Sequence, residues 1–213
     1  MSVDDQSKQK DAYIRLVDKI MLPVISKGLQ STKDRIQAEF MEILIECIVT
    51  DHSHNTSFLG SIQDVGHLMP SAGDDAESNF FENMKHIQKH RRGRAMRKLA
   101  KKLDENKEFL SRNCRQYLVY PMVRTYIYNS DYLSQPEIIN SAIACIAALA
   151  STFNWKDYKN LLLQFLVTRN QSNLDDNPPF QKQRVKVLAG ILDSFHFSPE
   201  EETSLRLKEV IER

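Results

Sequence analysis

Residues 143–155 read IACIAALASTFNW, and residues 185–197 read VKVLAGILDSFHF. Superposed at an offset of 42 residues, the two stretches place apolar residues opposite apolar residues and Ala147 opposite Ala189. A period of about 40 residues with two amphipathic helices per unit is typical of HEAT and armadillo repeats, which stack into solenoids. These stretches therefore predict an all-α fold, an α-solenoid of HEAT- or armadillo-type antiparallel helix pairs.

The composition of the 213-residue chain also favours helices. Gly (6) and Pro (7) are scarce, and 41% of the residues are hydrophobic, without an uninterrupted apolar run of about 18 that could span a membrane. We expect Pro23 to kink or divide a first helix, and Gly28 to end it. Further helices are expected from about residue 32 to 49, from 79 onwards, and over 106–128, 136–153, 155–169, 180–196 and 199–212, the last charged enough to cap an array.

These expectations divide the chain into three parts. Residues 1–50 form a helical pair, and residues 51–78, rich in Ser, Gly and Asp, form a polar and mobile loop. Residues 79–213 form HEAT-like helical repeats that begin with a basic helix.

The chemistry-bearing residues do not form the pattern of an enzyme. The sequence lacks the motifs GxxxxGK[ST], GxGxxG, GxSxG and HExxH, so we expect no catalytic residue, no cofactor and no small-molecule substrate. His86 and His90 are four residues apart, but their cationic neighbours disfavour a metal ion. The three cysteines lie far apart in apolar helical segments, where we expect buried apolar residues rather than a disulfide or metal site.

Five of the seven tyrosines lie in YLVYPMVRTYIYNSDY (117–132). Exposed aromatic rings can stack on single-stranded bases. Tyr117 and Tyr120, however, flank Leu118 and Val119 on a helix, where large rings usually pack against a neighbour. We therefore favour packing over base stacking for these residues.

A basic stretch is the most unusual feature of the sequence. Residues 85–102, KHIQKHRRGRAMRKLAKK, hold nine Lys or Arg and neither Asp nor Glu, although the whole chain carries a net charge of only +1. The remaining residues have 20 basic against 28 acidic side chains, so the basic stretch lies on an otherwise acidic chain. A single basic stripe on an acidic body indicates one localised contact with a negatively charged partner.

The apolar residues around this stretch indicate how it folds. The apolar stripes before and after it are rotated by roughly 100° relative to each other, and the slip falls at HRRGR, so we expect a bend or break near Gly93. Beyond it, Met96, Leu99 and Leu103 lie opposite the cations. RNA phosphates are one partner for the cations, with candidate residues Arg91, Arg92, Arg94, Arg97, Lys98, Lys101 and Lys102. An acidic protein surface, the acidic remainder of this chain, or a merely solvated face are the alternatives.

Four segments resemble a known family. NFFENMKHIQKHRRGRAMRKLAKKL (79–103) resembles a stretch of the Down-Regulated-In-Metastasis proteins, very large HEAT-repeat components of the small-subunit processome that are associated with a box C/D small nucleolar RNA. QYLVYPM (116–122), IINSAIACIAALASTFNWKDY (138–158) and LAGILDSFHF (188–197) resemble the helices that follow it. The resemblance covers residues 79–197, a little over half of the chain.

This resemblance implies a non-enzymatic scaffold of the nucleolus and nucleus, acting in small-subunit rRNA processing and ribosome biogenesis. Its partners would be pre-ribosomal RNA or small nucleolar RNA and other small-subunit processome proteins, with no membrane. It also implies more repeats than 213 residues can hold, so we expect an internal fragment or a truncated form. The alternative is a protein-binding helical-repeat adaptor or transport factor whose basic helix docks on an acidic partner.

Overall fold

The computed structural model describes residues 3–54, 59–70, 78–166 and 178–198. Every regular element within these ranges is a helix, which confirms the all-α prediction. No helix in the described ranges has both the length and the apolar character needed to cross a membrane. The expected helix over residues 199–212, with its capping role, lies outside the described residues.

In chain order the elements are α1 (Val3–Leu16), the π-helix η1 (Val17–Met21), α2 (Leu22–Leu29), α3 (Asp34–His54), the 3-10 helix η2 (Gly60–Leu68), α4 (Phe80–Lys85), α5 (Lys89–Glu105), the π-helix η4 (Cys114–Val119), α6 (Tyr120–Tyr128), the 3-10 helix η5 (Ser130–Tyr132), α7 (Pro136–Ala150), α8 (Trp155–Leu166) and α9 (Pro178–Asp193).

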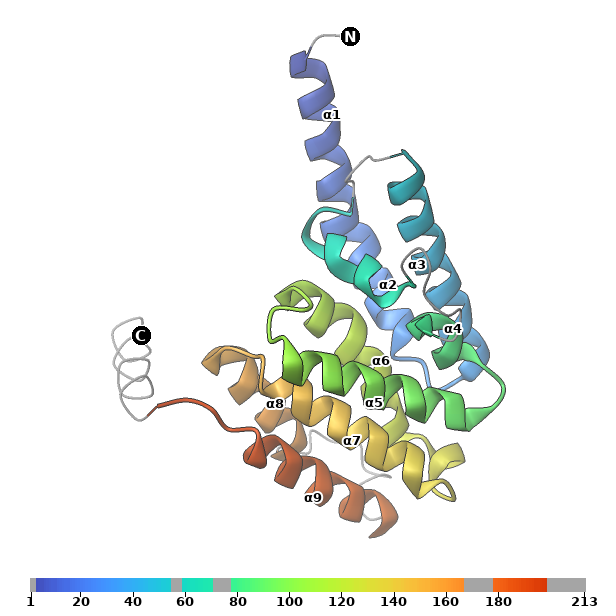
Figure 1. Ribbon diagram of the computed structural model, residues 1–213, viewed down its shortest axis with the longest axis vertical. Helices are drawn as coiled ribbons and strands as arrows, with labels where there is room; N and C mark the ends of the chain where they lie inside the picture. The colour runs from blue at the N-terminus through green and yellow to red at the C-terminus, as the bar shows by residue number, and fades with distance from the viewer. Residues whose placement is uncertain (1–2, 55–58, 71–77, 167–177, 199–213) are drawn as a thin grey trace.

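The helices α5, α7 and α9 form a row in which each packs against the next (Figure 1). Helix α6 contacts both α7 and α9, and α8 contacts α9. Helices α1, α2 and α3 extend away from this row, and α2 joins them to it by packing on η4 and α6 (Figure 1). Within the row α5 lies at the end nearer the N-terminal helices, and α7 lies between α5 and α9 (Figure 1).

Helix α7 is the centre of the core. Ala142, Cys145, Ile146 and Leu149 are fully buried, and their spacing of three and four residues keeps them on one face. Burial of each large aliphatic side chain stabilises the fold by about 1.5–3 kcal/mol. Helices α7 and α9 approach each other closely at Ala147 and Gly190. A Cβ built on Gly190 would lie 3.5 Å from the Ala147 Cβ.

Two prolines lie inside helices, and both follow a π-helical segment. Pro23 comes two residues after η1 ends, and Pro121 comes two residues after η4 ends. A proline lacks the N–H for the i−4 bond and clashes with that carbonyl, and a widened π turn provides the space. The break expected at Pro23 therefore takes the form of a π-helical turn, and the chain stays helical through it.

Gly28 does not end α2 in the way the sequence suggests. The helix continues to Leu29, and its C-cap Gln30 has right-handed helical dihedrals. A Cβ on Gly28 would lie 2.1 Å from Cδ2 of the Phe40 ring. This glycine is needed because α3 packs its aromatic side chain directly onto the backbone of α2.

Much of the segment expected to be a loop, residues 51–78, is helical. Helix α3 continues to His54, and η2 lies within the same segment. Leu59, Ile62, Val65 and Leu68 are all buried and recur every three residues, which is the period of a 3-10 helix. A search for the α-helical period of 3.6 residues misses this pattern. Residues 55–58 and 71–77 of this segment lie outside the described ranges.

Candidate nucleic-acid interface

The basic stretch begins at Lys85, the last residue of α4, and continues through the non-helical residues 86–88 into α5. Asn79 caps α4 by accepting a hydrogen bond from the Glu82 N–H at 3.1 Å, and His86 and Gln88 have extended backbone conformations. The expected break is therefore present, but it lies before α5 rather than near Gly93. Gly93 is buried inside α5, where a Cβ would lie 3.3 Å from the Ser141 Oγ of α7. The glycine thus permits close packing between α5 and α7 and does not bend the helix.

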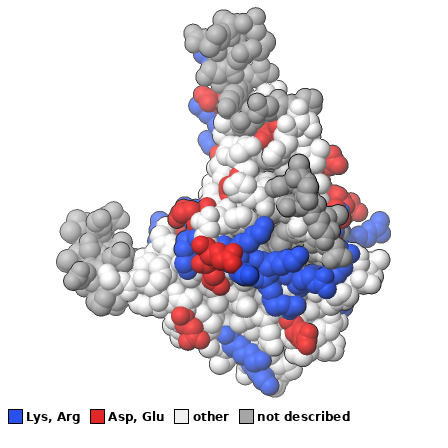
Figure 2. All heavy atoms as spheres, in the orientation of Figure 1, with Lys and Arg blue, Asp and Glu red and all other residues white. Residues whose placement is uncertain are grey.

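Helix α5 has one buried face and one basic, exposed face. Met96, Leu99 and Leu103 are almost completely buried, as the sequence pattern predicts. Figure 2 shows Lys and Arg side chains gathered in a band over α5, bordered by Asp and Glu. The exposed candidates are Arg94, Arg97, Lys98, Lys101 and Lys102.

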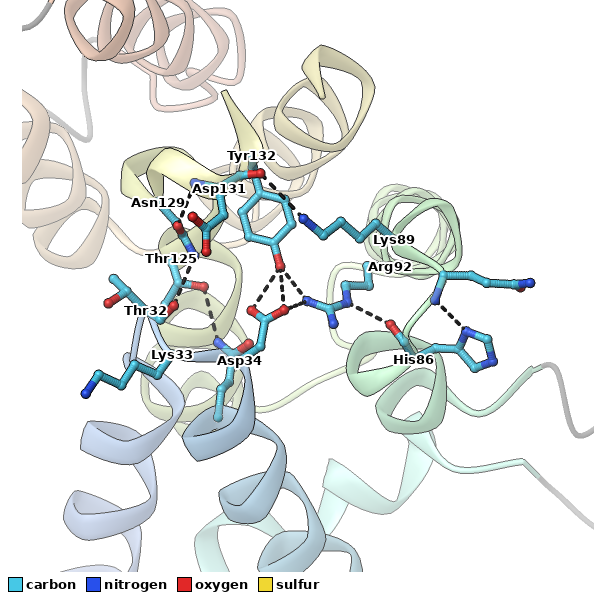
Figure 3. A network of polar contacts seen from close by, with 12 residues as sticks. Thr32, Lys33, Asp34, His86, Lys89, Arg92, Thr125, Asn129, Asp131 and Tyr132 are labelled. Atoms are coloured by element: carbon cyan, nitrogen blue, oxygen red, sulfur yellow. Dashed lines mark hydrogen bonds and ion pairs between the residues drawn. The ribbon is translucent and has the colours of Figure 1, made fainter. Parts of the chain in front are cut away.

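Arg92, one of the seven candidate RNA-binding residues, faces the interior. Only 6% of its surface is exposed, because position 92 lies one turn before Met96 on the buried face. Its Nη1 donates to the Asp34 carboxylate at 2.7 Å and to the Tyr132 hydroxyl, and its Nε donates to the His86 carbonyl at 3.0 Å. Figure 3 shows the resulting network, which joins α3, α5 and η5. In this structure Arg92 is a packing residue and its guanidinium is not accessible to a phosphate.

The surroundings of Arg92 keep its charge and keep Tyr132 neutral. Burial alone would lower the pKa of Arg92, but the oxygens of Tyr126, Asp34 and Tyr132 outweigh this, and its pKa is raised. Burial raises the pKa of Tyr132. The Tyr132 hydroxyl donates to the Asp34 carboxylate at 3.0 Å, so three polar groups satisfy one another.

Other cations near the start of α5 also have partners within the chain. Lys85 forms ion pairs with Glu42 and, at 2.8 Å, with Glu82. The half-buried Arg91 donates from Nε to the Asn83 Oδ1 at 2.9 Å. Lys89 places its Nζ 4.7 Å from the centroid of the Tyr132 ring, a cation–π contact. The same ammonium donates to the Asp131 carbonyl at 3.5 Å, which is the bond drawn in Figure 3. The acidic remainder of the chain therefore neutralises part of the basic stretch.

The cations in the second half of α5 have fewer and weaker contacts within the part of the chain that the structure describes. Arg97 donates to the Ser141 Oγ at 2.6 Å, and Lys101 lies 3.6 Å from the Glu105 carboxylate in an ion pair exposed on both sides. Lys102 lies 5.1 Å from the centroid of the Phe109 ring. Within the described ranges, the Lys98 ammonium has no hydrogen-bond or ion-pair partner. Exposed ion pairs stabilise a fold by at most about 1 kcal/mol, so these cations can exchange partners easily.

A groove of about 420 Å³ runs beside this half of the helix. Its apolar wall joins η2, α4 and α5 through Leu68, Phe80, Ala95 and Leu99, and Ser78 and Asn83 add polar atoms. The groove is also lined by four charged residues, Lys98, Lys101, Lys102 and Glu105. The sequence suggests the basic rim, but the groove depends on the 3-10 helix that the sequence pattern misses.

The other candidate side chains are mostly packed. Tyr120, Tyr126 and Tyr132 are buried, as expected, whereas Tyr117 is 43% exposed. Cys114 and Cys145 are fully buried, and burial raises the pKa of Cys145 to about 12. Among the described residues, no three His, Cys, Asp or Glu side chains are placed to hold a metal ion.

Comparison with known proteins gives two relatives. No protein-family model matches the chain. The chain is 30% identical over 175 residues, 82% of its length, to U3 small nucleolar RNA-associated protein 20 of Saccharomyces cerevisiae. It is 23% identical over 195 residues, 91% of its length, to the protein of the same name from Schizosaccharomyces pombe. The matched stretches amount to only 6% and 7% of these two relatives.

Proposed function

Because this chain belongs to the family of U3 small nucleolar RNA-associated protein 20, we propose that it is a non-catalytic scaffold segment of a pre-ribosomal particle. It acts in ribosome biogenesis and small-subunit rRNA processing, in the nucleolus and nucleus. Its partners are pre-ribosomal RNA or small nucleolar RNA and other proteins of the small-subunit processome. The names of the relatives support this proposal, although the chain matches only a small share of their length.

A HEAT-type solenoid is the architecture that we propose for this scaffold. The three helices of the row begin at Lys89, Pro136 and Pro178, so successive starts are separated by 47 and 42 residues. Spacings near about 40 residues, with each helix packed on the next, support stacked helical repeats. We propose that these repeats start at residue 79. The continuous helix formed by α1, η1 and α2 pairs with α3 and makes a separate helical pair before them.

We further propose that α5 binds RNA phosphates through Arg94, Arg97, Lys98, Lys101 and Lys102, with the half-buried Arg91 at the edge. The observation that carries this proposal is the exposed basic face of α5 on an otherwise acidic chain. Arg92 contributes from the inside by fixing α5 to α3.

The salt dependence of RNA binding tests this contact. If about five phosphates are neutralised, a plot of log affinity against log salt has a slope of about −3.5 to −4.5. Replacing the five exposed cations of α5 by Gln should abolish this slope. The matched control replaces five exposed cations of the N-terminal part of the chain, namely Arg15, Lys19, Lys27, Lys33 and Arg35. Affinity that is undetectable, insensitive to salt, or equally weakened in both variants would contradict the proposal.

Docking on an acidic protein is the second candidate function. It is favoured by Lys85 and Arg92, which already pair with carboxylates inside the chain. Pull-down from nuclease-treated extract separates the two functions, because protein contacts survive the loss of RNA. Retention of partners that depends on the exposed face of α5 would favour protein docking.

A further inference from the structure

The groove beside α5 has an apolar wall, which the binding of phosphates alone does not require. We propose that it binds an unpaired nucleotide of single-stranded RNA, with the base in the groove and the flanking phosphates on Lys98, Lys101 and Lys102. This inference rests on the proposed RNA contact of α5 and specifies the class of RNA that is bound.

The shape and lining of the groove support a base as the occupant. Its volume of about 420 Å³ falls within the range of small-ligand pockets, roughly 300–1,000 Å³. Leu68, Phe80, Ala95 and Leu99 provide an apolar wall for a flat ring, and the aliphatic parts of the lysine side chains extend it. Ser78 and Asn83 lie beside this wall, and the Asn83 amide is already bonded to Arg91 and to the Asn79 carbonyl.

The charges on the groove support phosphates next to that base. Three of its four charged lining residues are lysines, and the fourth, Glu105, is already paired with Lys101. Lys98 and Lys102 are one helical turn apart, about 6 Å along the axis, so two cations flank the recess on the same side. Lys98 has no ion-pair partner within the described ranges, and the Lys102 ammonium lies 5.1 Å from the centroid of the Phe109 ring.

Single-stranded RNA fits this combination better than duplex RNA. The bases of a duplex are stacked and paired, so their faces cannot enter an apolar recess, whereas an unpaired base can leave its stack. The faces of all bases are similar enough that such a recess accepts any of them. The groove therefore favours single-stranded over duplex RNA and requires a base to be present, but it does not distinguish one base sequence from another.

The test compares three oligonucleotides of equal length by fluorescence anisotropy with the full chain. They are a single-stranded RNA, the same strand with abasic residues at its centre, and a duplex. Removing the bases keeps every phosphate, so a loss of about 5- to 100-fold in affinity is expected for the abasic strand, and the duplex should bind at least as weakly. The variant Lys98→Gln/Lys102→Gln should weaken single-strand binding more than the control Arg15→Gln/Lys19→Gln, in which two exposed cations of the N-terminal helices are changed.

A second measurement does not depend on any variant. A strand with 4-thiouridine at its centre should crosslink to peptides that contain residues 78–83 and 95–102. Equal affinity for the intact and abasic strands, or crosslinks elsewhere, would overturn the groove assignment while leaving the phosphate contact intact. Absence of binding to every strand would overturn the proposed function itself. Preferential binding of an acidic peptide with a central Phe would overturn the assignment to RNA.

Discussion

At the scale of single residues, position on the helix decides what each cation of α5 does. Arg92 and Arg94 are two residues apart, yet Arg92 is 6% exposed and Arg94 lies on the exposed face. The density of charge along the sequence makes Arg92 and Arg94 equal candidates for binding RNA. The pattern of Met96, Leu99 and Leu103 identifies the buried face, and it places position 92 there by the four-residue spacing.

Replacing Arg92 by Met should destabilise the fold. The substitution removes the hydrogen bonds to Asp34, Tyr132 and the His86 carbonyl from a buried position. The expected loss is about 2 kcal/mol in the free energy of unfolding, measured by urea denaturation. Arg92→Lys keeps the charge but not this geometry, and should recover only part of the loss.

The control for this prediction is Lys98→Gln on the exposed face, which should change stability by less than about 0.5 kcal/mol. Equal stability of the wild type and Arg92→Met would show that the network with Asp34 does not hold α3 against α5.

The sequence predicts the exposed cations of α5 but not the partners of the buried ones. Asp34 and Tyr132 are separated from Arg92 by 58 and 40 residues, and no local pattern connects them. The acidic balance of the remaining chain indicates that carboxylates are available for pairing. Which carboxylate pairs depends on how α3 packs on α2 and α4, and so on where the start of α3 lies relative to α5, which only the tertiary structure provides.

At the scale of helices, α5 begins without the features that normally stabilise a helix start. Its N-cap Gln88 makes no side-chain capping bond, and the first turn has no acidic residue but holds Lys89, His90 and Arg91. Positive charges next to the positive end of the helix dipole are unfavourable. The junction between α4 and α5 is therefore a weak point in the secondary structure, and Ile87 within it is 91% exposed.

Gln88→Asp should stabilise the protein. The residue has the extended backbone, with φ −71° and ψ 100°, that a capping residue adopts. The Asp carboxylate can accept a hydrogen bond from an unpaired N–H of the first turn and offset the nearby positive charge. We expect a gain of about 0.5–2 kcal/mol in the free energy of unfolding, measured by urea denaturation.

Gln88→Asn separates the two contributions to this gain, because it caps without adding charge. It should provide part of the gain, and added salt should reduce only the remainder that Asp provides. Loss of stability in both variants would indicate that the Gln88 side chain has a structural role of its own.

The long amphipathic helices are predictable because one period, 3.6 residues, controls both folding and burial. Elements with other periods are missed. Leu59 and, within η2, Ile62, Val65 and Leu68 are buried every third residue inside a polar composition, and the backbone is kinked at Ile62. Gly93 illustrates another limit, because its low helix propensity suggests a break, whereas its packing against Ser141 keeps it inside a continuous helix.

At the scale of the whole molecule, ion pairs that connect distant helices make stability depend on pH. Asp157 at the start of α8 is 4% exposed and accepts two hydrogen bonds from Arg112, at 2.5 and 2.7 Å. Burial raises the pKa of Asp157, but the hydrogen bonds from Arg112 and Gln116 and the positive charges nearby outweigh this, and its pKa falls below the usual 3.8. The ion pair joins the segment before η4 to α8, so its loss affects the packing of the core.

Acid should therefore unfold the protein in part through Asp157. Because the folded pKa lies below 3.8, the unfolded chain binds the proton more tightly, and stability from this group is present above about pH 4 and lost as the pH falls further. Asp157→Asn should lower the thermal midpoint at pH 7, and the difference from the wild type should shrink as the pH falls below about 4. Asp193→Asn, at an exposed position of α9, serves as the control and should follow the wild type throughout. A difference between wild type and Asp157→Asn that stays constant from pH 7 to 3 would mean that Asp157 titrates alike in both states, so that the ion pair with Arg112 does not lower its pKa.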